Sequence, residues 1–172
     1  MGFCFSKNKY FSGIFLGTEK SGKTTIFKRL AKEEIDPNEI DIFHAKTCFF
    51  ENPSITLKLY DLPSGNDTWR HFIQSKDFVI FVMDNTLFDK DEIIKKKLNC
   101  LITDYYQEDE LNILFVINNK DDILFKVDFD KITEEFKLSE LKENIKWDLM
   151  ECNGLKNENV LGIVDWVYKN LS

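Results

Sequence analysis

Long apolar runs and closely spaced cysteines are both absent from this 172-residue chain. The longest apolar run, residues 78–83, falls far short of the roughly 20 residues that a membrane-spanning helix needs. The four cysteines stand at positions 4, 48, 100 and 152, too far apart for the paired ligands of a zinc site or for the dense disulfides of a small secreted domain. We therefore predict reduced thiols and a cytoplasmic protein.

A basic stripe is also absent, and the 30 Asp and Glu residues outnumber the 23 Lys and Arg residues. The net charge is −7, and no stripe of Lys and Arg interleaves with aromatic residues as a nucleic-acid-binding surface requires, so we expect no nucleic-acid partner. What the chain does have is a hydrophobic content of 43% with 16 phenylalanines, which suffices for the core of one domain. We predict a single domain over residues 9–172, preceded by a short tail, residues 1–8.

Six short apolar or β-branched runs predict strands. Two of them, residues 78–83 and 113–117, are apolar without alternation, which is typical of strands buried on both faces of a parallel sheet. The second and third runs are joined by Glu51-Asn52-Pro53-Ser54, a turn composition that predicts a hairpin. The predicted strands are residues 9–16, 45–50, 55–60, 78–83, 113–117 and 147–152.

Helical patterns separate these strands. One predicted helix covers residues 24–32, directly after the first strand. The alternation predicts an α/β fold: a mostly parallel six-stranded sheet with one antiparallel edge hairpin and helices on both faces. Ligands of such sheets bind at the carboxyl ends of the strands. Apolar residues also recur at helical spacing in two later segments, Ile94, Leu98, Leu101 and Tyr105, and Val160, Val164, Val167 and Leu171.

A glycine-rich segment between the first strand and the first helix matches a phosphate-binding loop, G-x-x-x-x-G-K-[ST], at every fixed position. Its backbone N–H groups, with the positive end of the following helix, are expected to hold the α- and β-phosphates. Lys23 would reach the β- and γ-phosphates, and the Thr24 hydroxyl would bind Mg²⁺. The alternative is a glycine turn with a surface lysine. The predicted phosphate-binding residues are Gly17, Thr18, Glu19, Lys20, Ser21, Gly22, Lys23, Thr24 and Thr25.

A second motif, Asn118-Asn119-Lys120-Asp121-Asp122, follows the predicted strand 113–117, on the same rim of the sheet as the glycine loop. Asp122 can accept both the N1–H and the N2–H₂ groups of guanine, a paired donor edge that adenine lacks. Asn119 is expected to fix the loop, and Lys120 to lie along the base plane. The alternative is a solvated polar connection between elements. Together the two motifs predict a protein that binds GTP or GDP with Mg²⁺.

The middle of the chain resembles a known family. Trp69-Arg70-His71-Phe72, then Gln74, then Ile80-Phe81-Val82-Met83-Asp84 resembles the W-R-H-Y-F-Q and I-F-V-V-D pattern of Arf proteins, with no insertion between the two parts. Asp165-Trp166 resembles the last helix of the same family. On these residues the chain is identified as a member of the Arf-like small GTPases, within the Ras-like P-loop superfamily.

The resemblance implies further roles. Cys152 and Asn153 stand where the family has Cys-Ala, which implies that the Asn153 N–H approaches the guanine oxygen. Asp61 would act on Mg²⁺ through water. Residues 42–70 would contact effector or assembly proteins. The family pattern also calls for a switch threonine that reaches Mg²⁺ and the γ-phosphate, and Thr47 is the nearest candidate, although a threonine in a strand is also ordinary.

The segment after the third strand departs from the family pattern D-x-x-G-Q. The chain reads Asp61-Leu62-Pro63-Ser64-Gly65-Asn66, so Ser64 replaces the glycine and Gly65 replaces the glutamine that orients the attacking water. Pro63 stiffens the backbone there. We therefore expect weak or no intrinsic GTP hydrolysis, and we assign no catalytic residue.

The N-terminus carries a lipidation pattern. Met1-Gly2-Phe3-Cys4-Phe5-Ser6 fits M-G-x-x-x-[ST], which predicts myristoylation of Gly2, with Cys4 placed for a second acyl chain. This would put the protein peripherally on a membrane. The alternative is a short tail that packs on the domain or on a partner.

Two functions remain open from the sequence. The first is an Arf-like GTP/GDP switch that recruits an effector. The second is a catalytically degenerate Arf-like domain that serves as a nucleotide-bound structural subunit of a larger assembly, stabilised by its ligand. A P-loop kinase is disfavoured, because such an enzyme does not need the guanine-reading pair Asn119 and Asp122.

Overall fold

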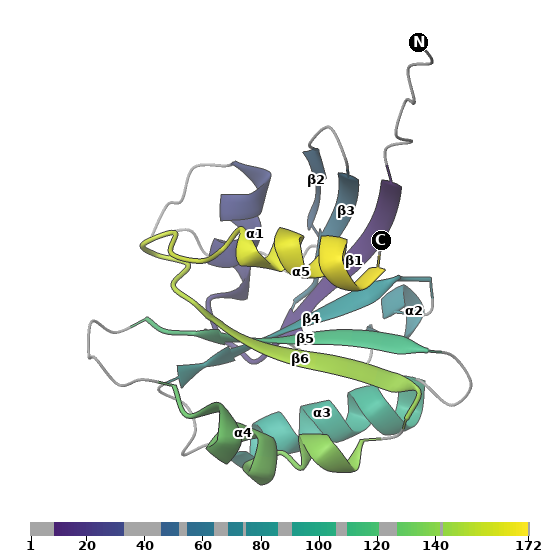
Figure 1. The fold of residues 1–172 in the computed structure, drawn as a ribbon, viewed down its shortest axis with the longest axis vertical. Helices are drawn as coiled ribbons and strands as arrows, with labels where there is room; N and C mark the ends of the chain where they lie inside the picture. The colour runs from purple at the N-terminus through teal and green to yellow at the C-terminus, as the bar shows by residue number, and fades with distance from the viewer. Residues whose placement is uncertain are drawn as a thin grey trace.

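A six-stranded β-sheet in the order β2-β3-β1-β4-β5-β6 runs through the centre of the molecule (Figure 1). The structure is a computed structural model. It describes residues 9–32, 46–51, 55–63, 69–73, 75–85, 91–105, 110–120, 127–141 and 143–171.

Five of the strands are parallel. β1 (Lys9–Gly17) pairs with both β3 (Ile55–Asp61) and β4 (Phe78–Asp84), and β5 (Leu111–Asn118) joins β4 to β6 (Ile145–Cys152). At the edge, β2 (Lys46–Glu51) runs antiparallel to β3. The predicted parallel sheet with one antiparallel edge hairpin is therefore confirmed.

Helices cover both faces of the sheet. In Figure 1, α1 (Lys23–Ala31) and α5 (Gly162–Leu171) lie on one face, and α3 (Asp91–Tyr105) and α4 (Phe129–Glu135) on the other. The short helix α2 (Trp69–Ile73) packs on the face that carries α3 and α4. A single 3₁₀ turn, Leu138–Glu140, follows α4. None of the helices within the described residues has the length and apolarity that crossing a membrane requires.

Each face of the sheet has its own hydrophobic core, which explains the uninterrupted apolar strands. All seven residues of β4 are buried, because alternate side chains enter opposite cores. Phe81 stacks edge to face with Phe115 towards α3, with ring centroids 6.0 Å apart. Phe15 does the same with Phe27 of α1, at 5.9 Å. Of the apolar residues predicted at helical spacing, Ile94, Leu98 and Leu101 lie in the core on the α3 face. On the α5 face, Val160, Val164 and Val167 lie in the other core and Leu171 packs against it.

The parallel strands all end at one rim, and this places the polar residues of the site. Asp84 at the end of β4 lies opposite Asn118 at the end of β5, and Asn118 lies opposite Cys152 at the end of β6. On the other side of β4, β1 runs directly into the glycine loop after Gly17. Segments that are far apart in sequence therefore converge at the carboxyl ends of the strands. The predicted division into a tail, residues 1–8, and a domain stays a prediction, since the tail lies outside the described residues.

Candidate functional site

The glycine loop, residues 17–24, connects the end of β1 to the start of α1, and its glycines are required by close contacts. A Cβ atom on Gly17 would lie 2.3 Å from the carbonyl oxygen of Val82 in β4. Gly22 is the N-cap residue of α1 and has a φ of +84°, a conformation that side chains rarely allow. The spacing of these glycines therefore has a structural cause as well as matching the motif. We call residues 17–24 the phosphate loop below.

A cavity of ≈ 260 Å³ opens over this loop. Most of its lining comes from the start of α1 and the residues just before it, where backbone N–H groups have no acceptor within the helix. The Ser21 hydroxyl in the lining is buried, and it has no hydrogen-bond partner within the described part of the chain. These are the groups that hold a phosphate, so the site fits one. The cavity is lined by Thr18, residues 20–25, Asn118, Lys120 and Leu155.

Lys23 and Thr24, which line the cavity, form a polar cluster with the buried Asp61. The Lys23 ammonium forms an ion pair with Asp61, and only 6% and 5% of the two side chains is exposed. The Thr24 hydroxyl donates a hydrogen bond of 2.7 Å to the other carboxylate oxygen of Asp61. Buried charges require such pairing.

The same cluster fits a magnesium ion. Mg²⁺ binds oxygen donors, in nucleotide sites through one or two protein ligands together with phosphate oxygens. The Thr24 hydroxyl and the Asp61 carboxylate are donors of this kind and lie side by side. Bound there, the ion would neutralise phosphate charge. Thr47, the third predicted ligand, lies opposite Tyr60 in the β2–β3 hairpin, and its side chain is outside the described set.

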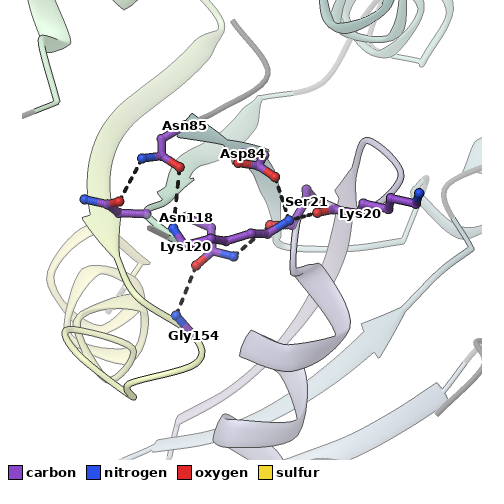
Figure 2. A network of polar contacts seen from close by, with 8 residues as sticks. Lys20, Ser21, Asp84, Asn85, Asn118, Lys120 and Gly154 are labelled. Atoms are coloured by element: carbon purple, nitrogen blue, oxygen red, sulfur yellow. Dashed lines mark hydrogen bonds and ion pairs between the residues drawn. The ribbon is translucent and has the colours of Figure 1, made fainter. Parts of the chain in front are cut away.

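Lys120 links the predicted base-binding segment to the phosphate loop. Its ammonium forms an ion pair with Asp84 at 2.6 Å and donates a hydrogen bond to the carbonyl oxygen of Lys20 (Figure 2). Lys120 also lines the cavity, as expected for a residue beside a bound base. The carboxylate of Asp84 is buried, so it holds the Lys120 side chain by charge in a low-dielectric setting.

Asn119 makes hydrogen bonds of the kind expected of a residue that fixes its loop. Its side chain donates a hydrogen bond of 2.9 Å to Glu151 and accepts one of 2.7 Å from Asn85. Its backbone N–H bonds to the carbonyl oxygen of Cys152 at 2.8 Å. It fixes its own loop to β6 and to the end of β4, and none of these three bonds reaches the phosphate loop.

The contact with the phosphate loop comes from Asn118, which sequence reasoning missed as a site residue. Its side-chain amide donates to the carbonyl oxygen of Ser21 at 2.8 Å, and its side-chain oxygen accepts from the N–H of Gly154 at 3.0 Å (Figure 2). One signal was available: a polar residue that ends an otherwise apolar strand stands at the rim where ligands bind.

The segment after β6, residues 153–155, is called the β6 loop below. The Asn153 N–H, expected at the guanine oxygen, donates to the carbonyl oxygen of Glu158 at 3.0 Å, so this amide is already engaged. Arg29 of α1 donates hydrogen bonds to the carbonyl oxygens of Gly154 and Leu155 at 3.1 and 2.6 Å, and so ties the loop to this helix. Leu155 lines the cavity.

Cys152 packs rather than reacts. Burial, with a smaller contribution from the charge of Glu151, raises the pKa of the Cys152 thiol to about 12. The thiol therefore stays protonated near neutral pH and is a poor nucleophile. Its carbonyl oxygen accepts a hydrogen bond from the Asn119 N–H, and its predicted place beside the base stays a prediction.

Several predicted site residues lie outside the described residues. They are Asp122 of the base motif, Ser64 and Gly65 of the altered switch segment, and Gly2 and Cys4 of the N-terminus. The residues that the structure does bring together are the phosphate loop, Asp61, Lys120 and the β6 loop.

The sheet order, with the glycine loop between the first strand and the first helix, defines a Ras-like α/β GTPase fold. Among solved structures, the Arl6 BBS3 small GTPase from Trypanosoma brucei, with the bound nucleotide analogue GppNp, is similar in fold. Its TM-score is 0.74 at 19% sequence identity, and the match covers 94% of this chain and 96% of that chain.

Sequence comparison defines the family. The model of the ADP-ribosylation factor family matches residues 1–171. The chain is 30% identical to ADP-ribosylation factor-like protein 1 of Saccharomyces cerevisiae, over 95% of this chain and 88% of that protein. It is 27% identical to ADP-ribosylation factor-like protein 3 of Caenorhabditis elegans, over 92% and 86% respectively. The chain therefore belongs to the ADP-ribosylation factor family and is an Arf-like small GTPase, as its motifs predicted. This membership supports a GTP-binding switch protein.

Proposed function

We propose that this protein binds GDP and GTP with Mg²⁺ and acts as a switch whose intrinsic hydrolysis is very slow. One observation carries the proposal: a single cavity joins the phosphate loop to Asn118 and Lys120 at the end of β5. A nucleotide needs a phosphate-binding side and a base-binding side, and residues predicted for both line this one cavity.

On the phosphate side, the backbone N–H groups of the phosphate loop would hold the α- and β-phosphates. Lys23 would turn from Asp61 to the β- and γ-phosphates. Thr24 and Asp61 would then hold Mg²⁺, Asp61 through water, and the ion would supply charge neutralisation between the phosphates. In the structure the Lys23 ammonium already lies at the carboxylate, so no buried charge is left alone before the ligand arrives.

On the base side, Lys120 would lie along the base, and Asp122 would accept the paired guanine donors. Equilibrium titration of the nucleotide-free protein with GDP and ADP tests the proposal directly. We expect GDP to bind far more tightly, and the nucleotide that co-purifies with the protein to be GDP or GTP. Equal affinity for the two diphosphates would remove the guanine assignment.

Intrinsic GTP hydrolysis is expected to be slower than the rate of about 10⁻⁴ s⁻¹ of an ordinary unassisted small GTPase. Phosphoryl transfer needs a positioned water, and Gly65 has no side chain that could orient one. Asn66 and Asp67 are the nearest polar residues, on shorter side chains beside Pro63, and a displacement of about 1 Å can cost roughly a hundredfold in rate.

Single-turnover hydrolysis of preloaded GTP measures this rate. An ordinary rate without a partner would contradict the expectation, and its loss in Asn66→Ala or Asp67→Ala would identify the compensating side chain. A very slow rate is expected of the switch and also fits our second candidate, a permanently loaded domain that serves as a structural subunit, because bound nucleotide stabilises the fold by mass action. In both cases we propose that residues 42–70 supply the surface for effector or assembly proteins.

We also propose that the protein is cytoplasmic and that its N-terminus carries a lipid anchor, which would place it peripherally on a membrane. A myristoyl chain on Gly2 alone gives only marginal binding, about 10⁴ M⁻¹, so stable attachment needs acylation of Cys4 or the nearby Lys7 and Lys9 as well. Intact-mass analysis of the protein from its native source should show loss of Met1 and gain of at least the myristoyl group. An unmodified chain that starts at Met1 would eliminate the anchor.

A further inference from the structure

Trp69, the first residue of α2, packs beside α3 and bonds to the segment that leaves the phosphate site. Its side chain is buried, with 4% of the residue exposed, in the same core as Leu98 of α3. The indole N–H donates a hydrogen bond of 3.2 Å to the carbonyl oxygen of Pro63. Pro63 stands two residues after Asp61, whose carboxylate pairs with Lys23. Trp69 therefore ties α2 both to α3 and to the chain next to the phosphate site.

Lys97 of α3 places a positive charge over this indole. Its ammonium lies 5.5 Å from the centroid of the Trp69 ring, within the range of about 6 Å in which a cation is attracted to a ring face. Lys97 is half-buried and lies between Ile94 and Leu98, which both enter the core. The preceding residue, Lys96, is exposed. The turn of the helix therefore brings Lys97, and not its neighbour, over the indole.

The charges of the phosphate loop reach the same ammonium. Burial lowers the pKa of Lys97, the carboxylate of Glu19 raises it, and the positive charge of Lys23 lowers it further. Glu19 and Lys23 both belong to the phosphate loop, so this loop and Lys97 interact by charge. Lys97 is not among the described residues that line the cavity, so its charge would act on bound phosphates across a gap and not by contact. Phosphates held at Lys23 would attract Lys97, and a third phosphate would attract it more strongly.

We infer that Lys97 is a positioning residue that couples the charge of the bound nucleotide to the position of α2. Its ammonium holds the Trp69 indole beside α3 and, by the same charge, favours a nucleoside triphosphate over a diphosphate. The inference rests on the proposed binding of guanine nucleotides. It assigns part of the preference for the extra phosphate to α3, a helix that carries none of the residues predicted for the site from the sequence motifs.

The first test measures the affinities of GDP and of GppNp, a GTP analogue that resists hydrolysis, at low ionic strength. Lys97→Met keeps an unbranched side chain that can pack on the indole but removes the charge. We expect the preference for GppNp over GDP to fall by about threefold to tenfold, the effect of one charge acting across several ångströms of partly screened space. This loss should shrink as salt is added, because salt screens such interactions.

Two variants control this measurement. Lys96→Met makes the same change of charge at the adjacent exposed lysine, where solvent screens the charge, so its preference for GppNp should stay within about twofold of the wild type. Lys97→Arg keeps both the charge and the attraction to an aromatic ring, so it should restore most of the wild-type preference. A purely structural role of Lys97 would not produce a loss that depends on salt and on one phosphate.

The second test follows α2 itself. Hydrogen exchange of residues 69–73 should accelerate by about twofold to fivefold in Lys97→Ala, which removes the contact with the Trp69 ring. In the wild type we expect the exchange of this segment to differ between the GDP and GppNp forms. The difference should shrink in Lys97→Ala but not in Lys96→Ala. If Lys97→Ala does not fold, Lys97→Met, which keeps nearly the same volume, carries the comparison of the two nucleotide forms.

Three results would overturn the inference. They are an unchanged preference for GppNp in Lys97→Met, an equal loss of preference in Lys96→Met, and unchanged exchange of residues 69–73 in Lys97→Ala. Failure of the wild type to bind GDP would instead overturn the proposed function. In that case the exchange of residues 69–73, measured without nucleotide in the wild type and Lys97→Ala, still decides whether Lys97 holds α2.

Discussion

Replacement of Lys23 by alanine is expected to lower the affinity for GDP and GTP by about a hundredfold to ten-thousandfold. The ammonium group would make charge-assisted hydrogen bonds to the β- and γ-phosphates, each with a contribution of about 1.5–3 kcal/mol. Lys23 lies in the phosphate loop with 6% of its side chain exposed, so water cannot take over the role of the lost charge. Isothermal titration of nucleotide-free protein measures the change.

Lys23→Ala also leaves the buried Asp61 carboxylate without its ion-pair partner, which is expected to reduce the free energy of unfolding by about 3–5 kcal/mol. The double variant Lys23→Ala/Asp61→Asn removes that unpaired charge, so it should recover stability without recovering affinity. Lys169→Ala, at an exposed lysine near the end of α5, serves as the control for loss of one positive charge. Tight GDP binding by a folded Lys23→Ala protein would contradict the phosphate-loop assignment.

The second large effect concerns the base. Asp122→Asn is expected to weaken GDP binding by about a thousandfold and to shift preference toward xanthosine diphosphate. An amide cannot accept both donors of guanine, and a site built to bond a polar group loses much more than one bond when the match is broken. Xanthine has a carbonyl group where guanine has the amino group, so it can accept from the new asparagine amide.

Competition of the two diphosphates for the variant protein measures this shift. Asp121→Asn provides a matched control, because it makes the same change at the adjacent residue. A shift toward xanthine in Asp121→Asn, and none in Asp122→Asn, would show that the carboxylate that reads the base is one position earlier than the motif indicates.

Most of the fold was accessible from sequence because its signals are local. The apolar runs at residues 78–83 and 113–117 predicted strands buried on both faces, and these became β4 and β5, with their ends one or two residues further out. The helix α4 was not predicted. It has one buried residue, Ile132, so it carries almost no apolar periodicity, and its N-cap is Asp128, whose carboxylate accepts a hydrogen bond from the N–H of Lys131.

The sequence by itself was enough to identify the phosphate loop and the family. The residues that define each of them lie close together along the chain, so their spacing can be recognised without knowledge of the fold. The glycine positions follow from the strand–loop–helix geometry, and Lys23 and Thr24 are placed by the helix that begins there. Only the tertiary structure decided which asparagine ties the loops together. Asn118 meets Ser21 from 97 residues away and Gly154 from 36, and these contacts arise only when β5 lies beside β6 and β4 beside β1. The side chains of consecutive residues leave a strand on opposite sides, so Asn118 and Asn119 look equivalent in sequence, and the sheet alone directs one to the phosphate loop and the other to Glu151.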